Sequence, residues 1–242
     1  MNRVSIIIPA QNEEKNISST IKNITQSLQE NCISYEVIVI NDGSNDKTED
    51  VVLALARDDK DIVLVNNPGP YGLGNAIRLG LQNFHGDAVI ISMADGSEDS
   101  RDFVSYVWTL DEGYDCCFGS RWMKGGATQG YPVLKYLLNR LGNFVIRFLF
   151  GIPYNDITNA FKGYSREVID KMQPLSAEHF DITIEMPLKA IIHGAEYKVI
   201  PIKWYGRKEG KTKLILKEMG SNYLKTLLKL YKNRNVKGVR AN

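Results

Sequence analysis

Cysteine and histidine are scarce in this chain of 242 residues, which has three of each. Cys32 stands alone and Cys116 and Cys117 are adjacent, so the cysteines have neither the even count of a disulfide framework nor the spacing of metal ligands. The histidines lack ligand spacing too. We therefore exclude a disulfide-stapled scaffold and expect a reduced, cytosolic setting, with Cys116 and Cys117 buried in a strand.

Long hydrophobic runs are also absent. No apolar span approaches the roughly 18 residues that a membrane-crossing helix needs. The apolar run before Pro9 is only five residues long, which is too short for the core of a signal peptide. We expect a chain that is soluble or peripheral to a membrane.

Two phosphate-binding signatures are missing or incomplete. The chain has no G-x-x-x-x-G-K-S/T segment, which disfavours a P-loop nucleotidase. The run Gly72-Leu73-Gly74 begins like a dinucleotide fingerprint, but the third glycine is absent and the run follows the third predicted strand. Either Gly72 and Gly74 place backbone N–H groups near a diphosphate at a helix start, or they form a tight turn.

Charge is distributed unevenly, although the net charge is only +2. Residues 198–242 carry 13 Lys and Arg against two acids, whereas residues 1–197 carry 17 against 26. Such a basic tail attracts an anionic membrane surface, nucleic acid or a phosphorylated substrate. The tail has no aromatic stacking pattern or reading motif, so we expect no nucleic-acid binding.

The first 100 residues alternate between strand and helix patterns. Short runs rich in Val and Ile predict strands at 4–8, 35–40, 62–65 and 88–93. Apolar residues at helical spacing predict helices at 13–29, about 44–57 with a cap at Ser44 or Asn45, and 72–84. This alternation predicts a parallel, doubly wound α/β sheet.

The alternation loosens after residue 100. We expect a helix at 103–112, a strand at 114–118, a glycine-rich loop at 119–130, a helix at 180–193 and a strand at 197–204. Two further helices, at 134–150 and 216–232, are amphipathic, and the second is rich in Lys. The first either packs its apolar face on the core or lies at a membrane interface, and the basic face of the second is either solvated or attracted to such an interface.

An acidic cluster follows the predicted strand at 88–93. Ligands bind beyond the carboxyl ends of the strands in open α/β sheets, so Asp95, Glu98 and Asp99 could hold a phosphate-bound divalent cation there. The alternative is a solvated acidic turn.

Six stretches of the chain, taken in order, resemble family 2 glycosyltransferases, and most of all the dolichyl- or polyprenyl-phosphate mannosyltransferase branch. They are V-S-I-I-I-P-A-Q-N-E-E at 4–14, E-V-I-V-I-N-D-G-S-N-D-K-T at 36–48, G-L-G-N-A-I-R-L-G at 72–80, A-D-G at 94–96, G-S-R at 119–121 and R-K-E-G-K-T-K at 207–213. The resemblance implies the A-type nucleotide-sugar fold: α/β, Rossmann-like, with a mostly parallel sheet flanked by helices and a C-terminal amphipathic helix. We expect a catalytic domain at 1–213, with a nucleotide-sugar half at about 1–100 and an acceptor half at about 101–213, and a basic helix and tail at 214–242.

The resemblance also implies the donor site. Pro9, Gln11 and Glu13 match the segment that cradles the nucleotide, and Asp42 matches the acid that accepts from the base. Gly72 and Gly74 complete the predicted donor-binding set. Asp95 matches the second acid of the family's D-x-D, which bridges Mg²⁺ or Mn²⁺ to the diphosphate, but Met93 stands where the first acid would be. This departure leaves metal dependence open; Glu98 or Asp99 could assist, and we predict Asp95 and Asp99 as the ligands.

On the acceptor side, Arg121, Arg207 and Lys213 resemble the family's cations around the two phosphate groups. An alcohol acceptor would need a general base, whereas a polyprenyl phosphate is already an anion. The base-bearing E-D-x-x-R/W segment of sugar-to-sugar enzymes is absent, and N-D-I-T-N-A-F-K-G-Y at 155–164 resembles the lipid-phosphate branch. Asp156 either serves as a base or orients a lysine or arginine.

The expected activity is an inverting, metal-assisted transfer of a sugar from a nucleotide-sugar to a polyprenyl phosphate. We expect a peripheral enzyme on the cytoplasmic face of a membrane, and a homo-oligomer is compatible with the sequence. One alternative is a sugar-to-sugar transferase of surface polysaccharide assembly, with Asp156 or Glu185 as base. The other is a catalytically silent nucleotide-sugar binder, which Met93 suggests.

Overall fold

The computed structural model describes residues 1–206 and 216–234, and its first part alternates strand and helix as predicted. The elements are β1 (Val4–Ala10), α1 (Ile17–Glu30), β2 (Tyr35–Asn41), α2 (Thr48–Asp58), β3 (Ile62–Asn66), α3 (Leu73–Asn83) and β4 (Ala88–Ile91). β1 pairs in parallel with β2 and β4, and β2 pairs in parallel with β3. Because parallel strands all end at the same edge, the loops after them meet there.

The second part departs from strict alternation. Its elements are α4 (Ser100–Asp111), β5 (Cys116–Ser120), β6 (Ala127–Gln129), α5 (Val133–Phe150), β7 (Lys162–Ser165), α6 (Arg166–Lys171), α7 (Ile182–Ile192), β8 (Tyr197–Pro201), β9 (Lys203–Tyr205) and α8 (Leu216–Lys232). The sheet order is β3-β2-β1-β4-β7-β5-β8, and β7 lies antiparallel between β4 and β5. The mostly parallel sheet of the prediction is therefore confirmed.

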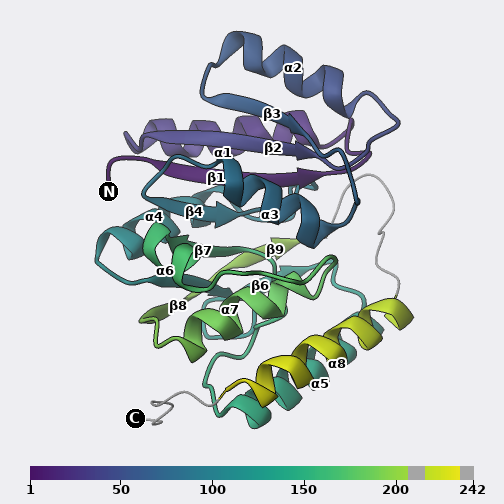
Figure 1. Ribbon diagram of the computed structural model, residues 1–242. Coiled ribbons are helices and arrows are strands. Elements are labelled where there is room, and N and C mark those ends of the chain that lie inside the picture. The colour runs from purple at the N-terminus through teal and green to yellow at the C-terminus, as the bar shows by residue number, and fades with distance from the viewer. Residues whose placement is uncertain (207–215, 235–242) are drawn as a thin grey trace.

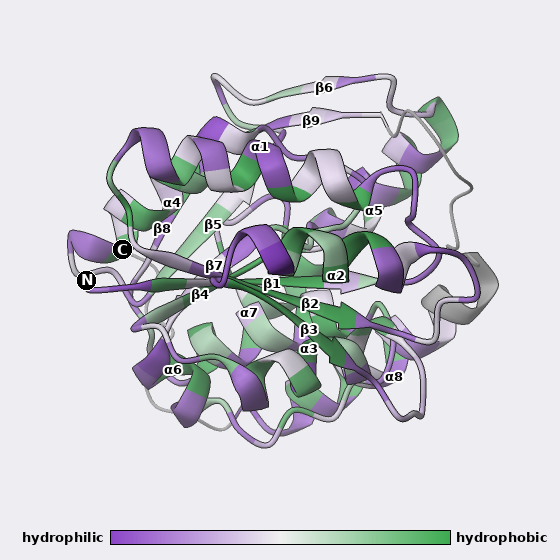
Figure 2. Cartoon of the chain, turned by 90° about the horizontal axis from the view of Figure 1, so that it is seen from above, coloured by the Kyte–Doolittle hydropathy of each residue, from purple (hydrophilic) through white to green (hydrophobic). Residues whose placement is uncertain are grey.

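Helices cover both faces of the sheet (Figures 1 and 2). One core cluster packs α1, α2 and α4 against the sheet, through residues such as Ile21, Val52 and Tyr106. The other packs α3, α6 and α7 against the opposite face and extends to the inner sides of α5 and α8, through residues such as Ile77 and Ile184. Cys116 and Cys117 are buried in β5, as predicted, one in each cluster.

Several predicted boundaries were wrong. β7 and α6 were not predicted at all, and the expected strand at 197–204 is two strands, of which β9 pairs with β6 inside the predicted glycine-rich loop. Helix α1 begins at Ile17 rather than residue 13, and Lys47, not Ser44 or Asn45, is the N-cap residue of α2. Residues 13–16 and 44–47, which were predicted to be helical or capping, instead belong to loops at the carboxyl edge of the sheet.

Helix α5 carries its apolar face outward. Among its exposed side chains are Leu141 at 61% and Phe148 at 81% exposure. The full set of exposed apolar residues on this helix is Val133, Leu134, Tyr136, Leu137, Leu138, Leu141, Phe144, Val145 and Phe148. Of the two interpretations of α5, the structure therefore excludes the one in which this face packs on the core.

Helix α8 lies beside α5 (Figure 1). The rings of Phe150 and Tyr231 are 6.1 Å apart, and Arg234 Nη1 donates to the Leu149 carbonyl at 2.7 Å. Leu224 and Leu228 of α8 are exposed as well. Within the described ranges, no helix has the length and hydropathy needed to cross a bilayer.

Candidate active site

A cavity of about 690 Å³ opens at the carboxyl edge of the sheet. One side is lined by residues that follow β1, β2, β3 and β4, including Gln11, Asp42 and Asp95. The other side is lined by Arg121 after β5 and by residues of α5 and α8, including Asn139 and Tyr223. The cavity thus joins the loops of the first part of the chain to the helices of the second.

Most of the predicted site residues line this cavity. They are Pro9, Gln11, Glu13, Asp42, Gly72, Asp95 and Arg121. Gly74, Asp99 and Asp156 lie outside the lining. Arg207 and Lys213 belong to the part of the chain outside the described residues, so their predicted roles remain predictions.

Asp42 fixes the loop that follows β3. Its Oδ1 accepts from Asn67 Nδ2 at 2.7 Å and its Oδ2 accepts from the Gly72 N–H at 2.9 Å. The Gly74 N–H donates to the Glu178 carbonyl at 3.0 Å. Both glycine N–H groups are therefore engaged by protein acceptors, and the structure favours the tight turn over the diphosphate cradle.

The two glycines also allow a close approach of chains. Gly72 has φ of +146°, and a Cβ there would lie 2.5 Å from the Glu178 carbonyl oxygen. A Cβ at Gly74 would lie 2.2 Å from the carbonyl oxygen of Ala177. These contacts require glycine at both positions because the loop at 177–179 passes directly over the start of α3.

The acidic turn after β4 contains a carboxylate with one buried oxygen that has no partner among the described residues. Glu98 Oε1 accepts weakly from the Met93 N–H at 3.4 Å, and Glu98 Oε2 is buried without a hydrogen-bond partner among the described residues. Burial raises the pKa of Glu98 to about 8, and the negative charge of Asp95 adds to the rise. Asp95 Oδ1 accepts from the Ser97 N–H at 3.1 Å.

Asp99 has a different environment. It caps α4 by accepting from the Arg101 N–H at 3.1 Å, and it also accepts from the Arg101 side chain at 2.9 and 2.6 Å. The Tyr205 hydroxyl donates to it at 3.3 Å. Hydrogen bonds from Arg101 hold the pKa of Asp99 below its usual value. Its carboxylate therefore stabilises a helix start and does not face the cavity.

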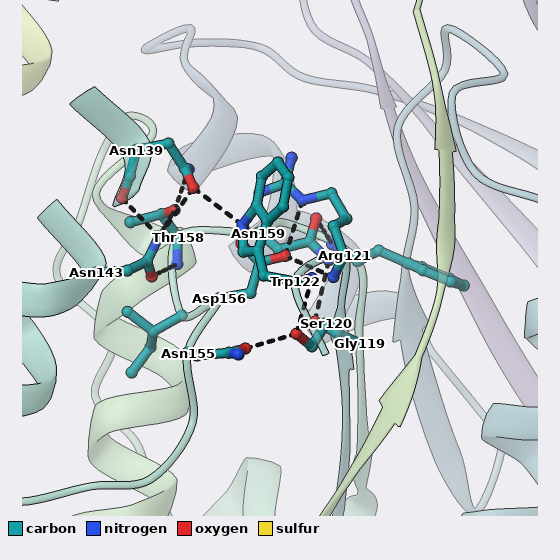
Figure 3. A network of polar contacts seen from close by, with 12 residues as sticks. Gly119, Ser120, Arg121, Trp122, Asn139, Asn143, Asn155, Asp156, Thr158 and Asn159 are labelled. Atoms are coloured by element: carbon teal, nitrogen blue, oxygen red, sulfur yellow. Dashed lines mark hydrogen bonds and ion pairs between the residues drawn. The ribbon is translucent and has the colours of Figure 1, made fainter. Parts of the chain in front are cut away.

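Arg121 and Asp156 form a buried ion pair (Figure 3). Asp156 Oδ2 accepts from the backbone N–H and Nε of Arg121 at 3.0 and 2.8 Å, and Oδ1 accepts from Nη2 at 2.7 Å. The Arg121 guanidinium lies 5.3 Å from the ring centres of both Trp122 and Tyr131. Of the two roles considered for Asp156, the structure favours the one in which it orients an arginine.

The polar row of α5 consists of Lys135, Asn139, Asn143 and Arg147. Asn139 and Asn143 lie on the side of the helix that faces Trp122 and the Arg121–Asp156 pair (Figure 3). Asn139 accepts from Trp122 Nε1 at 3.2 Å and donates to Thr158 Oγ1 at 2.7 Å. Asn143 donates to the same Thr158 oxygen at 3.0 Å. Lys135, one turn before Asn139, lines the cavity. The helix therefore contributes its polar side to the site and its apolar side to the molecular surface.

Glu185 is buried on α7, and its carboxylate accepts hydrogen bonds from the loop that precedes this helix. Its carboxylate accepts from the Ser176 and Ala177 N–H groups at 2.9 and 2.7 Å. Burial acts to raise the pKa of Glu185, but these hydrogen bonds outweigh it and the pKa is lowered. The side chain lies outside the cavity lining, which does not favour a role as a base.

The sequence pattern did not identify several residues of the site. Lys135, Tyr131, Trp204 and His179 line the cavity, and Lys162 is fully buried behind it. The Lys162 ammonium donates to the carbonyls of Ile157 at 2.9 Å, Thr183 at 3.2 Å and Asn159. Only Lys135 had a usable signal, because it shares the polar row of α5.

Comparison with known proteins agrees with this architecture. The model of the family described as Glycosyl transferase family 2 matches residues 5–173, so the chain belongs to this family and is a glycosyltransferase. It is 29% identical to polyprenol monophosphomannose synthase of Mycolicibacterium smegmatis, over 94% of this chain and 85% of that protein. It is 27% identical to glycosyltransferase AglD of Haloferax volcanii, over 92% of this chain but only 36% of AglD.

Solved structures share the fold. Glucosyl-3-phosphoglycerate synthase of Mycobacterium tuberculosis, in complex with UDP, matches with a TM-score of 0.71 at 20% identity, over 96% of this chain and 80% of that one. The A-type fold implied by the sequence resemblance is confirmed. That synthase was also solved with Mn²⁺, UDP and phosphoglyceric acid, and with Mg²⁺ and UDP.

The acidic turn of this chain fits a divalent cation of that kind. No group of three His, Cys, Asp or Glu side chains forms a metal site in residues 1–206 and 216–234. Mg²⁺ and Mn²⁺ on a nucleotide need fewer protein ligands, because water and phosphate oxygens complete the coordination. The unpaired carboxylate oxygen of Glu98, beside Asp95, supplies a hard ligand of the required type.

Proposed function

We propose that the chain transfers a sugar from a nucleotide-sugar to a polyprenyl phosphate at a membrane surface, with inversion at the sugar carbon. The observation that carries the proposal is the orientation of α5. Its polar row, with Lys135 and Asn139, lines the cavity, while its apolar row is exposed. An acceptor with an anionic head and a hydrocarbon tail matches both sides of this one helix. The mycolicibacterial relative is named for a polyprenol, which is a hydrocarbon chain of this kind.

The donor is assigned to the side of the cavity formed by residues 9–98. Gln11 and Glu13 follow β1, and Asp42 follows β2, where an α/β sheet binds nucleotides. Asp42 is held by Asn67 and Gly72, so its carboxylate is fixed in place before a base arrives. We assign the acceptor to the side formed by Arg121 and by α5, α7 and α8. The predicted donor half at about 1–100 and acceptor half at about 101–213 remain a prediction, and on this assignment α8 belongs to the acceptor side as well.

A divalent cation at Asp95 would neutralise the charge that builds on the departing diphosphate. Side chains of the protein supply the other positive charge at the site. Arg121 is held by Asp156 in one orientation and presents a fixed positive charge at the cavity wall. Such a preorganised charge stabilises a developing negative charge without the cost of reorientation.

The acceptor side supports an anionic nucleophile. Of the carboxylates in the described ranges, Asp181 is the one that lines this side of the cavity, and it accepts from Thr226 Oγ1 at 2.7 Å and from the His179 N–H at 3.3 Å. Asp156 and Glu185 lie outside the lining and are bonded to Arg121 and to two backbone N–H groups. A phosphate oxygen needs no base because it carries its negative charge at neutral pH. Its attack on the sugar carbon, opposite the leaving diphosphate, inverts that carbon in one displacement. Lys135 and Arg121 supply positive charge for the incoming phosphate.

The exposed face of α5 supports a peripheral position on a membrane. Nine apolar side chains of this helix are exposed, and Leu224 and Leu228 of the neighbouring helix add to them. Burying such a surface among lipid headgroups is favourable, and Lys residues of α8 add attraction to anionic lipids. We assign the enzyme to the cytoplasmic face, where nucleotide-sugars would be the donors.

The test is a donor and acceptor panel. The intact chain is given UDP-, GDP-, CDP- and dTDP-sugars with a short polyprenyl phosphate, the matching polyprenol, or neither, and nucleoside diphosphate release is measured. We expect release from one donor class that rises sharply only with the polyprenyl phosphate. Equal release with the uncharged polyprenol would contradict the anionic nucleophile. Tight donor binding without release under any condition would favour a silent binder, and release driven by free sugars would favour a sugar-to-sugar enzyme.

A further inference from the structure

The acidic turn leaves one buried oxygen without a partner. Glu98 Oε2 is shielded from solvent and has no hydrogen-bond partner within the described ranges, whereas Oε1 accepts from the Met93 N–H at 3.4 Å. Leaving a carboxylate in this condition is costly, since buried polar groups are normally satisfied. This cost is offset if a ligand binds Glu98 Oε2 when the protein functions.

The surroundings of Glu98 identify the kind of group. Glu98, Asp95 and Met93 all line the cavity, so the two carboxylates share one short turn at the edge of the same space. Two neighbouring carboxylates that repel each other are both relieved by a cation. The carboxylate of Glu98 also reaches back to the backbone of Met93, the position at which the D-x-D pattern of the family would place an acid.

We propose that Glu98 is the second carboxylate of a divalent cation site with Asp95, and that it takes the place of the acid missing at Met93. The inference rests on the proposed function, because the cation would be the one that accompanies the donor diphosphate. Asp99, the next residue, is excluded from this role by its bonds to Arg101 and by its position outside the cavity lining. The two adjacent acids of the turn thus have separate tasks: Glu98 binds the cation and Asp99 caps α4.

Direct Mn²⁺ binding tests the proposal without any assay of transfer. The free Mn²⁺ signal in electron paramagnetic resonance is followed as protein is added, with Mn²⁺ alone and with UDP or GDP present. The variants are Glu98→Gln, Asp95→Asn and Asp99→Asn. We expect Glu98→Gln and Asp95→Asn to weaken Mn²⁺ binding at least tenfold. Asp99→Asn is the matched control, since Asn is also a good N-cap, and we expect less than a twofold change.

Thermal unfolding separates a ligand from a structural residue. A cation that binds only the folded chain raises the unfolding temperature, and a weaker site gives a smaller rise. Gln fills the space of Glu98 without its charge, so we expect Glu98→Gln to unfold at the wild-type temperature or above it when metal is absent. We expect the rise produced by Mn²⁺ to disappear. A merely structural Glu98 would give the reverse: a lower unfolding temperature and an unchanged rise with Mn²⁺.

Three results would overturn the inference. They are wild-type Mn²⁺ binding by Glu98→Gln, loss of binding in Asp99→Asn but not in Glu98→Gln, and no Mn²⁺ binding by the wild-type chain even with a nucleoside diphosphate. Each is distinguishable from failure of the proposed function. Lipid-dependent transfer that persists alongside any of these results leaves the function standing, whereas normal Mn²⁺ binding with no lipid-dependent transfer leaves only the cation site.

Discussion

At the scale of single residues, the site depends on buried charges that are held by protein partners. Arg121 and Asp156 have side-chain exposures of 6% and 0%, and together they form three hydrogen bonds. A buried pair of this kind contributes little net stability compared with apolar packing. Removing one partner is nevertheless destabilising, because the other charge is left buried and unpaired. Its value here is that it fixes the direction of a cation at the cavity wall.

Replacement of Asp156 by Asn should therefore affect both stability and activity. The variant leaves the Arg121 guanidinium buried without its counter-charge, and we expect a loss of about 3–5 kcal/mol in the free energy of unfolding. Urea denaturation measures this loss. The exposed pair of Lys198 and Glu112 is the control, and Glu112→Gln should change nothing measurable. Equal, small effects in both variants would show that the buried pair does not hold Arg121.

Lys162 gives a prediction with a pH dependence. Its ammonium bonds three carbonyls behind the cavity, and burial lowers its pKa to about 7 although Asp156 acts to raise it. The unfolded chain keeps the proton up to a pKa of about 10.4, so between these values the unfolded state binds more protons and stability rises with pH.

Lys162→Met removes both the bonds and the titration. We expect a loss of several kcal/mol at neutral pH, at about 1–3 kcal/mol for each carbonyl left unsatisfied. The difference in unfolding free energy between wild type and variant should then grow with pH above about 7, by on the order of 1 kcal/mol per pH unit. Denaturation at a series of pH values measures it. A difference that stays constant from pH 7 to pH 10 would show that Lys162 keeps its proton in the folded chain.

At the scale of elements, the start of α3 and the face of α5 determine the shape of the cavity. The loop at 177–179 crosses α3 at Gly74, where a Cβ would meet the Ala177 oxygen at 2.2 Å. We expect Gly74→Ala to lower the unfolding temperature, since the obstruction is backbone and cannot rotate away. Gly142→Ala within α5 is the control, because nothing lies within 4 Å of its added Cβ and Ala favours helix. A Gly74→Ala chain as stable as wild type would mean that the loop can shift.

The exposed row of α5 predicts membrane binding. We expect a triple variant, Leu141→Glu, Phe144→Glu and Phe148→Glu, to lose sedimentation with vesicles of anionic lipid. Three exposed apolar side chains are removed and three negative charges are added. Transfer to a short, dispersed acceptor should persist. Leu53→Glu on α2, an exposed apolar residue on another helix, is the control and should bind vesicles as wild type does. Vesicle binding by the triple variant would exclude α5 as the contact.

At the scale of the whole molecule, the sequence predicted one side of the cavity better than the other. Gln11, Asp42 and Asp95 each follow a strand with a clear apolar run, and strand ends meet at one edge, so their convergence could be inferred. Strand β7 was missed because Lys-Gly-Tyr-Ser has neither alternation nor an apolar run. Its lysine is buried and donates to the nearby carbonyls of Ile157 and Asn159 and to the carbonyl of Thr183 on α7, and hydrophobic periodicity does not reveal such contacts.

The acceptor side could not be predicted for a similar reason. It is assembled from α5, the start of α7 and α8, which are widely separated along the chain. The amphipathic pattern of α5 was visible, but periodicity alone does not tell which face is turned outward. Tertiary contacts decide this, because the polar row pairs with Thr158 and Trp122.

The two-sided character of α5 has a consequence for kinetics. On the proposed function, α5 would join the surface that contacts lipid to the polar wall of the cavity, so the depth of the enzyme in the membrane would be coupled to the position at which the acceptor binds. Turnover should then follow the mole fraction of acceptor within the bilayer rather than its bulk concentration. Diluting the acceptor with inert phospholipid at constant total amount would slow the enzyme.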